Sequence, residues 1–217
     1  MTCAQDFTLV PTEPFAMADI DIRALHASPV MRAMLGDLLI ETVANGGSVS
    51  FMHPLAREEA DAFWNNALAA ADLNKRIVLG AFDGDMLAGT VTLLLDCPPN
   101  QPHRGEIAKM MTRMSHRGRG IATALMHAAE KLAVAHKRTL LVLDTATDGG
   151  AAGLYEKLGF TLSGEIPDYA RKPHGGLTGT LIYWKRSGCV VALAGWVPAR
   201  HHSLRSGCCQ LGPAACR

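Results

Sequence analysis

Residues 110–122 read MMTRMSHRGRGIA, and this stretch decides how the chain folds. A strand-like beginning leads through a turn with Gly118 and Gly120 into a segment whose apolar residues share one helical face. A helix that follows such a turn exposes backbone N–H groups at its positive end, where phosphates bind. Arg117 and Arg119 would add charge-assisted contacts that suit a pyrophosphate. Taken alone, the stretch is equally consistent with a basic strand-to-helix turn.

The patterns on either side of this stretch predict a mixed α/β sheet. Apolar spacings of three and four residues predict helices over 30–43, from Pro54 to about Asp72, from Gly120 to Ala135, and over 151–158. Extended patterns predict strands over 6–10, 77–82, 86–95, 107–112, 140–143, 160–163 and 180–184. Asp83-Gly84 is expected to form a hairpin turn, and the proline-rich segment 97–105 to form a loop.

Composition and charge exclude several classes of protein. The chain has 217 residues, of which 48% are hydrophobic, so it can bury one sizeable core. No apolar run reaches the ~20 residues that a bilayer span needs, and no secretory signal opens the sequence. Residues 1–186 carry 18 basic and 20 acidic residues, which gives no support to nucleic-acid binding.

The sequence divides into a domain over 1–186 and a tail over 187–217, which we expect to be loosely packed or disordered and dispensable. Four of the six cysteines lie in this tail, so a disulfide framework is not expected and a reducing cytoplasm is the default location. No metal is expected, because the tail histidines and cysteines do not have the spacing of a zinc site.

Two segments resemble a known family. Arg117-x-x-Gly120-x-Ala122 after a strand resembles the acyl-CoA signature of the GCN5-related N-acetyltransferase (GNAT) superfamily, and residues 154–160, LYEKLGF, are similar to another of its elements. Further segments resemble its tabtoxin-resistance acetyltransferase branch; these are 46–52, 106–110, 143–145 and 164–169. The tail has no counterpart in this resemblance.

The resemblance implies the GNAT fold, a mixed and mostly antiparallel central sheet flanked by helices, with splayed central strands that hold acyl-CoA. It implies acetyl-CoA as the co-substrate. The residues expected to bind it are Met110, Met111, Thr112, Arg117, Gly118, Arg119, Gly120, Ile121, Ala122 and Thr123. Asp148 stands where many members have asparagine, and we expect its carboxylate to point away from the pyrophosphate.

Acetyl transfer from a thioester to an amine needs a neutral amine, a stabilised oxyanion and a protonated thiol. A lysine-like amine has a pKa of ~10.4, so a base must remove its proton. If their strands are adjacent, Glu106 and Asp144 converge on the reacting amine. The resemblance implies a catalytic acidic pair here, with Glu106 as general base through water and Asp144 as its partner or the anchor of the amine. The alternative interpretation is that Glu106 is a solvated residue at a strand end and that Asp144 caps a helix or loop.

Tyr155 is the expected general acid. A phenol with a pKa of ~10 gives its proton to a thiolate, whose conjugate acid has a pKa of ~8.5, at a cost of only about 2 kcal/mol. A core tyrosine is the alternative interpretation. A backbone N–H near Met111 is expected to meet the oxyanion, while residues 110–112 pair with pantetheine as an added strand would. His116 is expected to be a solvated loop residue.

The acceptor pocket is defined least well by the sequence. Ser48, Phe51 and the loop 98–103 are candidates for one wall, and Tyr169 for the other. The expected acceptor is a small-molecule amine, such as a toxin or antibiotic of tabtoxin type, which attacks directly in a ternary complex. A protein or peptide amine, which needs an open groove, and a non-catalytic acyl-CoA-binding module are the alternatives. A monomer or a homodimer is expected.

Overall fold

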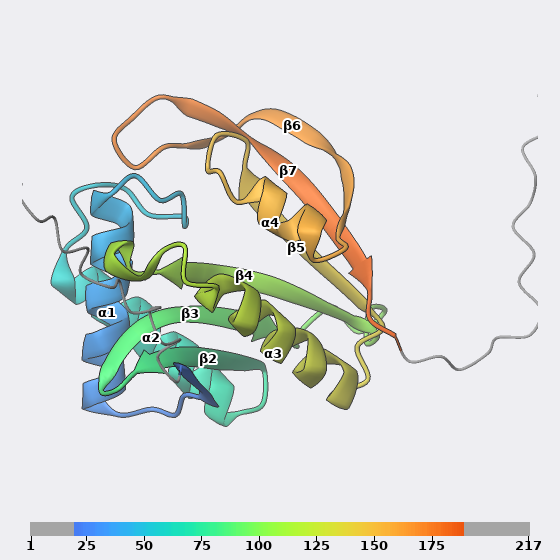
Figure 1. Cartoon of the computed structure of the whole chain (residues 1–217), viewed down its shortest axis with the longest axis horizontal. Coiled ribbons are helices and arrows are strands. Elements are labelled where there is room, and N and C mark those ends of the chain that lie inside the picture. Colours follow the sequence, from blue (N-terminus) through green and yellow to red (C-terminus); the bar gives the residue numbers. More distant parts are fainter. Residues whose placement is uncertain (1–19, 189–217) are drawn as a thin grey trace, which may run out of the picture.

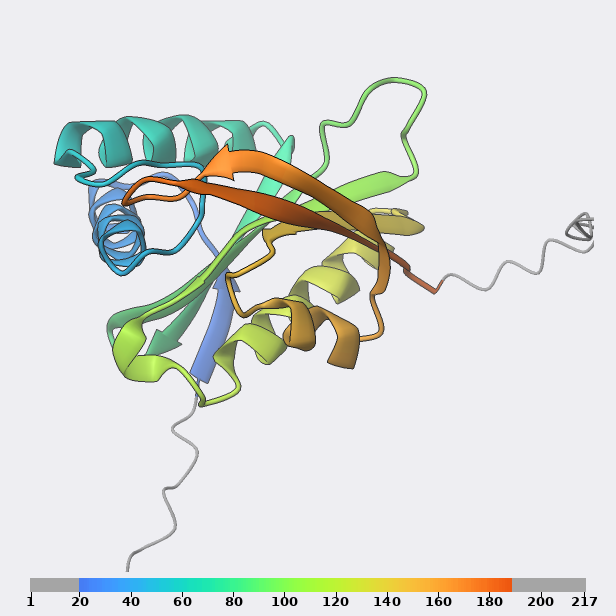
Figure 2. The same ribbon diagram turned by 90° about the horizontal axis from the view of Figure 1, so that it is seen from above.

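The computed structural model describes residues 20–188, in which seven strands form one sheet with helices on both faces (Figures 1 and 2). In chain order the elements are β1 (Ile20–Ala24), α1 (Pro29–Ala44), α2 (Arg57–Asp72), β2 (Arg76–Asp83), β3 (Met86–Leu94), β4 (Arg104–Thr112), a short 3-10 turn (Met114–His116), α3 (Ile121–Ala135), β5 (Leu140–Ala146), α4 (Ala152–Lys157), β6 (Thr161–Arg171) and β7 (Leu177–Arg186). The strand predicted over 6–10 and nearly all of the predicted tail lie outside the described residues.

The strand order is β1-β2-β3-β4-β5-β7-β6. Neighbouring strands are antiparallel except for β4 and β5, which are parallel. The predicted mixed, mostly antiparallel sheet flanked by helices is therefore confirmed. The parallel pair lies in the middle of the sheet, and α3 provides the crossover that a parallel connection requires.

Three details of the prediction were wrong or incomplete. The strand β1 pairs with β2 from Ile20 to Ala24, and it was missed because only two of its five residues are partly buried. The hairpin turn consists of Gly84 and Asp85 rather than Asp83-Gly84, with Gly84 in the left-handed region at φ 59°. The strand β6 continues to Arg171, far beyond the predicted end, because pairing with β7 rather than an apolar pattern defines it.

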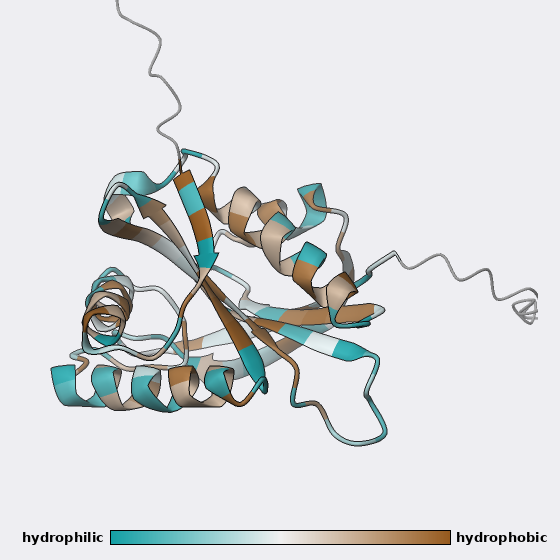
Figure 3. Ribbon diagram, turned by 90° about the horizontal axis from the view of Figure 1, so that it is seen from below, coloured by the Kyte–Doolittle hydropathy of each residue, from teal (hydrophilic) through white to brown (hydrophobic). Residues whose placement is uncertain are grey.

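Two apolar cores lie on opposite faces of the sheet. One packs α3 and α4 against the strands and includes Leu125, Leu143 and Phe160. The other packs α1 and α2 against the strands and includes Leu39 and Trp64. Along α2, hydrophilic and hydrophobic bands alternate, as expected for a helix with one buried face (Figure 3).

Local signals explain where the helices that flank the site begin and end. Ser28 caps α1 by accepting a hydrogen bond from the Met31 N–H at 3.1 Å, and Asn45 and Gly46 end this helix. The loop between α1 and α2 therefore starts at a fixed point above the sheet. In the described part of the chain, no helix is long and apolar enough to cross a membrane, and no cluster of metal-ligating side chains occurs.

Candidate active site

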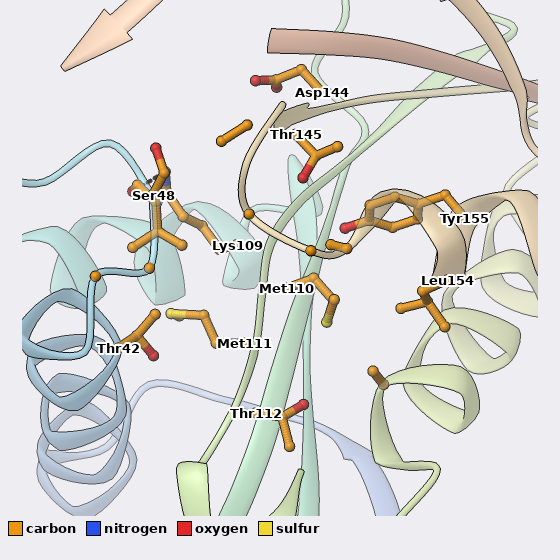
Figure 4. A pocket seen from close by; sticks show the side chains of 18 of the residues that line it. Thr42, Ser48, Lys109, Met110, Met111, Thr112, Asp144, Thr145, Leu154 and Tyr155 are labelled. Carbon is orange, nitrogen blue, oxygen red and sulfur yellow. Dashed lines mark hydrogen bonds between the residues drawn. The ribbon is translucent and has the colours of Figure 1, made fainter. Parts of the chain in front are cut away.

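The central feature of the sheet is the point where β4 and β5 separate. They pair at only three positions, the last of which joins Glu106 to Val142. Beyond it, β5 continues along β7 while β4 continues along β3, so the two parallel strands splay apart as predicted. A cavity of about 900 Å³ lies between and above them; we call it the cleft (Figure 4).

The cleft has two sides. The side toward α3, here called the α3 side, is lined by Met110, Thr112, residues 117–118, residues 120–123 and Leu154. The side toward α1, here called the α1 side, is lined by residues 45–50, Lys109, Asp144 and residues 169–171. Tyr155 lies between these two groups, with its hydroxyl directed into the cleft (Figure 4).

A β-bulge interrupts β4 inside the cleft. Met111 pairs with Thr90 and Ala108 with Thr92, so Lys109 and Met110 together oppose the single residue Val91. The extra residue reverses the alternation of the strand: Ile107 packs in the α3 core, and Met111 packs in the α1 core. On the β5 side, the backbone from residue 107 to 112 has no ladder partner within residues 20–188, so the N–H and C=O groups that face this side are available to a ligand.

A phosphate site is predicted at the start of α3, where residues 117–118 and 120–123 line the cleft. Gly118 and Gly120 have φ values of 77° and 76°, and the space beside both Cα atoms is open. Among the described residues no side chain caps α3, so the N–H groups of its first turn have no partner there, and residues 120–123 line the cleft. Nearby, the buried Thr112 hydroxyl has no hydrogen-bond partner within the described protein. These are the unpaired donors that a phosphate- and amide-containing ligand would satisfy.

The two arginines of this loop have different roles. Arg117 lines the cleft, whereas Arg119 forms an ion pair with Asp83 at 3.0 Å and is absent from the lining. Asp83 also lies 3.3 Å from Nε2 of His116, whose side chain is buried. The expectation of a solvated His116 was wrong, because the β2–β3 hairpin reaches under the loop and holds it. Arg119 is expected to position the loop rather than to contact the ligand.

Tyr155, the predicted general acid, lines the cleft. The strong helical pattern around it places the side chain on the inner face of α4, where only 5% of its surface is exposed. Burial, together with the charge of Asp144, raises the pKa of its phenol to about 12. Tyr155 is therefore a weaker acid than an ordinary tyrosine. Transfer of its proton to a thiolate with a conjugate-acid pKa of ~8.5 costs about 5 kcal/mol.

The two predicted carboxylates do not meet in the cleft. Asp144 lines it, follows the splay point and accepts a hydrogen bond from the Thr180 hydroxyl at 3.3 Å (Figure 4). Glu106 lies at the last paired position of β4, below the splay, and is absent from the lining; its carboxylate contacts Arg104 at 3.0 Å. Of the two carboxylates, only that of Asp144 lies in the cleft. A catalytic role for Glu106 stays a prediction.

The walls of the α1 side differ in part from the expectation. Ser48 and Tyr169 line the cleft, whereas Phe51 and the loop 98–103 do not. Phe51 instead stacks edge-on against Phe63 of α2, with ring centroids 5.2 Å apart. Asp148 also lines the cleft, where its carboxylate contacts Lys172 and accepts a hydrogen bond from the Thr178 hydroxyl; that it points away from the pyrophosphate stays a prediction.

Lys109 is a residue of the cleft that sequence reasoning missed. Its Nζ donates to the Val49 carbonyl at 2.8 Å and contacts the Ser50 hydroxyl at 3.0 Å. Burial lowers the pKa of this amine, and the charge of Asp144 partly offsets the effect. The only available signal was a lysine between apolar residues, within the run Ile107 to Met111; the bulge that directs its side chain toward the α1 side could not be predicted from spacing.

The α1 side is bridged by two segments that are distant in sequence. The tip of the β6–β7 hairpin meets the α1–α2 loop, where the His53 N–H donates to the Pro173 carbonyl at 2.9 Å. The ring centroids of His53 and His174 lie 4.5 Å apart, and Nε2 of His174 lies 3.1 Å from the carbonyl oxygen of Ala44. Figure 2 shows this hairpin crossing above the sheet toward the loop that follows α1. These contacts join the hairpin tip to the α1–α2 loop beside the cleft.

Comparison with known proteins adds a family assignment. A model described as the acetyltransferase (GNAT) family matches residues 41–160. This match covers the splay point, the bulge, the α3 loop and Tyr155.

Solved structures also share the fold. The yncA protein of Salmonella typhimurium, determined with its cofactor acetyl-CoA, has a TM-score of 0.64 and 14% identity; the match covers 79% of this chain and 96% of that one. Ribosomal-protein-alanine N-acetyltransferase from Brucella melitensis has a TM-score of 0.63 and 19% identity, over 76% and 98%. A candidate phosphinothricin N-acetyltransferase has a TM-score of 0.64 and 16% identity, over 77% and 99%. Identities this low establish the shared fold alone.

Proposed function

Because the chain belongs to the acetyltransferase (GNAT) family, we propose that it transfers the acetyl group of acetyl-CoA to the amine of a small molecule, by direct attack while both are bound. Family membership makes it an acetyl-CoA-dependent enzyme; the proposal concerns the acceptor and the residues that act on it. One observation supports it: a single cleft joins the uncapped N-terminus of α3 to the carboxylate of Asp144, with Tyr155 between them.

The α3 side fits the acetyl donor. The unpaired edge of β4 can hydrogen-bond to the amides of pantetheine as a neighbouring strand would, and the Thr112 hydroxyl offers one further contact. The free N–H groups of α3 and the side chain of Arg117 suit the pyrophosphate. The thioester would then lie near the bulge, where a backbone N–H around Met111 can donate to the developing oxyanion.

Asp144 is the carboxylate that we place at the acceptor amine. It anchors the amine and accepts its proton as the nitrogen attacks the thioester carbon. The N–C bond forms, the C–S bond breaks and the electron pair leaves on sulfur. Glu106 could assist only through solvent, because it lies outside the lining and is paired with Arg104.

Tyr155 is proposed to stabilise and then protonate the leaving sulfur. A pKa of about 12 keeps the phenol protonated at every working pH, so it is always available as a hydrogen-bond donor. The cost of full proton transfer falls if the same dry surroundings also raise the pKa of the leaving thiol. The proton lost by the amine can return the tyrosine to its starting state.

The shape of the α1 side favours a small acceptor over a protein. The contact between the β6–β7 hairpin tip and the α1–α2 loop bridges this side, whereas a peptide needs an open groove. The segments that resemble the tabtoxin-resistance branch, 46–52 and 164–169, contribute to this same wall. We therefore propose a toxin or antibiotic amine of that type, acetylated in the cytoplasm.

The test is acetyl-CoA-dependent thiol release by purified protein with tabtoxin-like amino acids, aminoglycosides, polyamines and lysine peptides. A small-molecule amine is expected to give turnover that falls about 100-fold in Tyr155→Phe. Tyr183→Phe is the matched control: it removes the hydroxyl of an adjacent core tyrosine that bonds to Glu156 at 3.0 Å, outside the cleft. Turnover of lysine peptides alone would overturn the small-molecule assignment, and acetyl-CoA binding without any turnover would favour the non-catalytic module.

A further inference from the structure

Lys109 is a lysine of the central strand β4, and its side chain makes contacts that are unusual for a lysine. Its side chain crosses from β4 to the loop after α1, where it bonds to the Val49 carbonyl and the Ser50 hydroxyl (Figure 4). Its Nζ also lies 5.7 Å from the ring centroid of Phe51 and 5.6 Å from that of Phe63. A carbonyl, a hydroxyl and two aromatic faces together compensate a cation that is partly removed from water.

The two residues that meet here have strained backbones. Lys109 has a φ of 50° and Ser50 a φ of 73°, a left-handed region that is unfavourable for residues with a side chain. Such strain persists only where surrounding contacts hold it in place, and it concentrates at functional sites. Lys109 contacts Ser50 directly, so the bulge in β4 and the turn in the loop stabilise each other.

This contact connects two parts of the cleft, in addition to the ion pair between Glu41 of α1 and Arg113 after β4. Lys109 belongs to the bulge whose neighbour, Met110, faces the α3 side, and the loop 45–50 is the wall of the α1 side. An ammonium has three N–H donors, and the two contacts above occupy two of them. The third is left for the cleft, where Asp144 is the carboxylate whose charge acts on this amine.

We propose that Lys109 is a positioning residue of the acceptor site: its ammonium holds the loop 45–50 against the bulge of β4 and so fixes the acceptor wall relative to the acetyl donor. The expected effect on catalysis rests on the proposed function, whereas the contact between Lys109 and the loop is independent of it. Besides Lys109 and Asp144, the titratable or charged groups that line the cleft are His116, Arg117, Asp148, Tyr155, Tyr169 and Arg171; the loop 45–50 supplies none.

Hydrogen exchange of the protein without acceptor tests the contact independently of activity. In Lys109→Met, amides 46–51 are expected to exchange at least 10-fold faster, because the tie is lost, while amides 121–126 of α3 keep their rates. Lys131→Met, at an exposed position of α3, is the matched control and should change neither segment. Unchanged exchange at 46–51, or equal acceleration in both segments, would overturn the proposal.

A double-mutant cycle separates the contact from a general loss of stability. Ser50→Ala should accelerate exchange at 46–51 about 3-fold in the wild-type background and have no effect in the Lys109→Met background. An equal effect in both backgrounds would show that Lys109 and Ser50 act independently, and the proposal would fail.

In kinetics, loss of the Lys109 contact should affect the acceptor amine but not acetyl-CoA. With the amine that the panel identifies, Lys109→Met should raise the acceptor KM about 10-fold, leave the Kd of acetyl-CoA unchanged and lower kcat less, whereas Lys109→Arg should restore part of the KM. A rise in the acetyl-CoA Kd equal to the rise in acceptor KM would contradict the assignment to the acceptor wall. If no amine is turned over, the proposed function fails while the exchange experiment still decides the role of Lys109.

Discussion

The α3 side of the cleft presents backbone groups from one continuous stretch, whereas the α1 side presents side chains from four segments that are distant in sequence. The free N–H groups, the bulge and the two glycines all fall within 107–123. The α1 side combines residues 45–50, Lys109, Asp144 and residues 169–171. Backbone donors tolerate changes of side chain, so the acceptor side can vary while the donor side stays the same.

The largest expected effect concerns which carboxylate acts on the amine. Asp144→Asn should lower kcat/KM for the acceptor about 100-fold and leave the Kd of acetyl-CoA unchanged, because the base is lost from the α1 side only. Glu106→Gln should lower it less than 10-fold, since this residue is paired with Arg104 outside the lining. Steady-state kinetics and calorimetry of both variants provide the measurement. A greater loss in Glu106→Gln would assign the base to Glu106 through water.

Arg117 and Arg119, in the loop before α3, test which side chains of the α3 side bind acetyl-CoA. Arg117→Ala should raise the Kd of acetyl-CoA about 10-fold, the value of one charge-assisted hydrogen bond. Arg119→Ala should change this Kd less than 3-fold, because its guanidinium pairs with Asp83. Calorimetric titration with acetyl-CoA measures both. Equal losses in the two variants would mean that Arg119 leaves Asp83 when the ligand binds.

The sequence predicted these two sides unequally, for a physical reason. The α3 side was found from adjacent residues, since a strand, a glycine turn and a helix start form one local pattern. The α1 side depends on tertiary contacts. The bulge in β4 changes the direction of the Lys109 side chain. Glu106 pairs with Val142, only two residues before Asp144, yet the strands separate between these positions, so that only Asp144 lies in the cleft. Periodicity cannot reveal either feature. The missed strand β1 likewise depends on pairing with β2.

The pH dependence of stability tests the burial of Tyr155 between the two sides. Its pKa is raised from 10.0 in the unfolded chain to about 12 in the fold, so its contribution is complete below pH 10 and is lost as pH rises toward 12. Between pH 9 and pH 11, wild type should lose about 1.4 kcal/mol more of its unfolding free energy than Tyr155→Phe. Other groups titrate in both proteins and cancel. Urea unfolding at the two pH values gives the difference; parallel losses would mean that the phenol is hydrated.

The smallest expected effect lies at the bridge over the α1 side. His174→Ala removes the contact with the Ala44 carbonyl and with the His53 ring, so the hairpin tip is held less firmly. The acceptor KM should rise about 3-fold, the value of one modest hydrogen bond, with the KM of acetyl-CoA unchanged. His127→Ala, on the exposed face of α3, should change neither constant. A lower acceptor KM in His174→Ala would show that the bridge obstructs the acceptor, which would favour a protein amine over a small molecule.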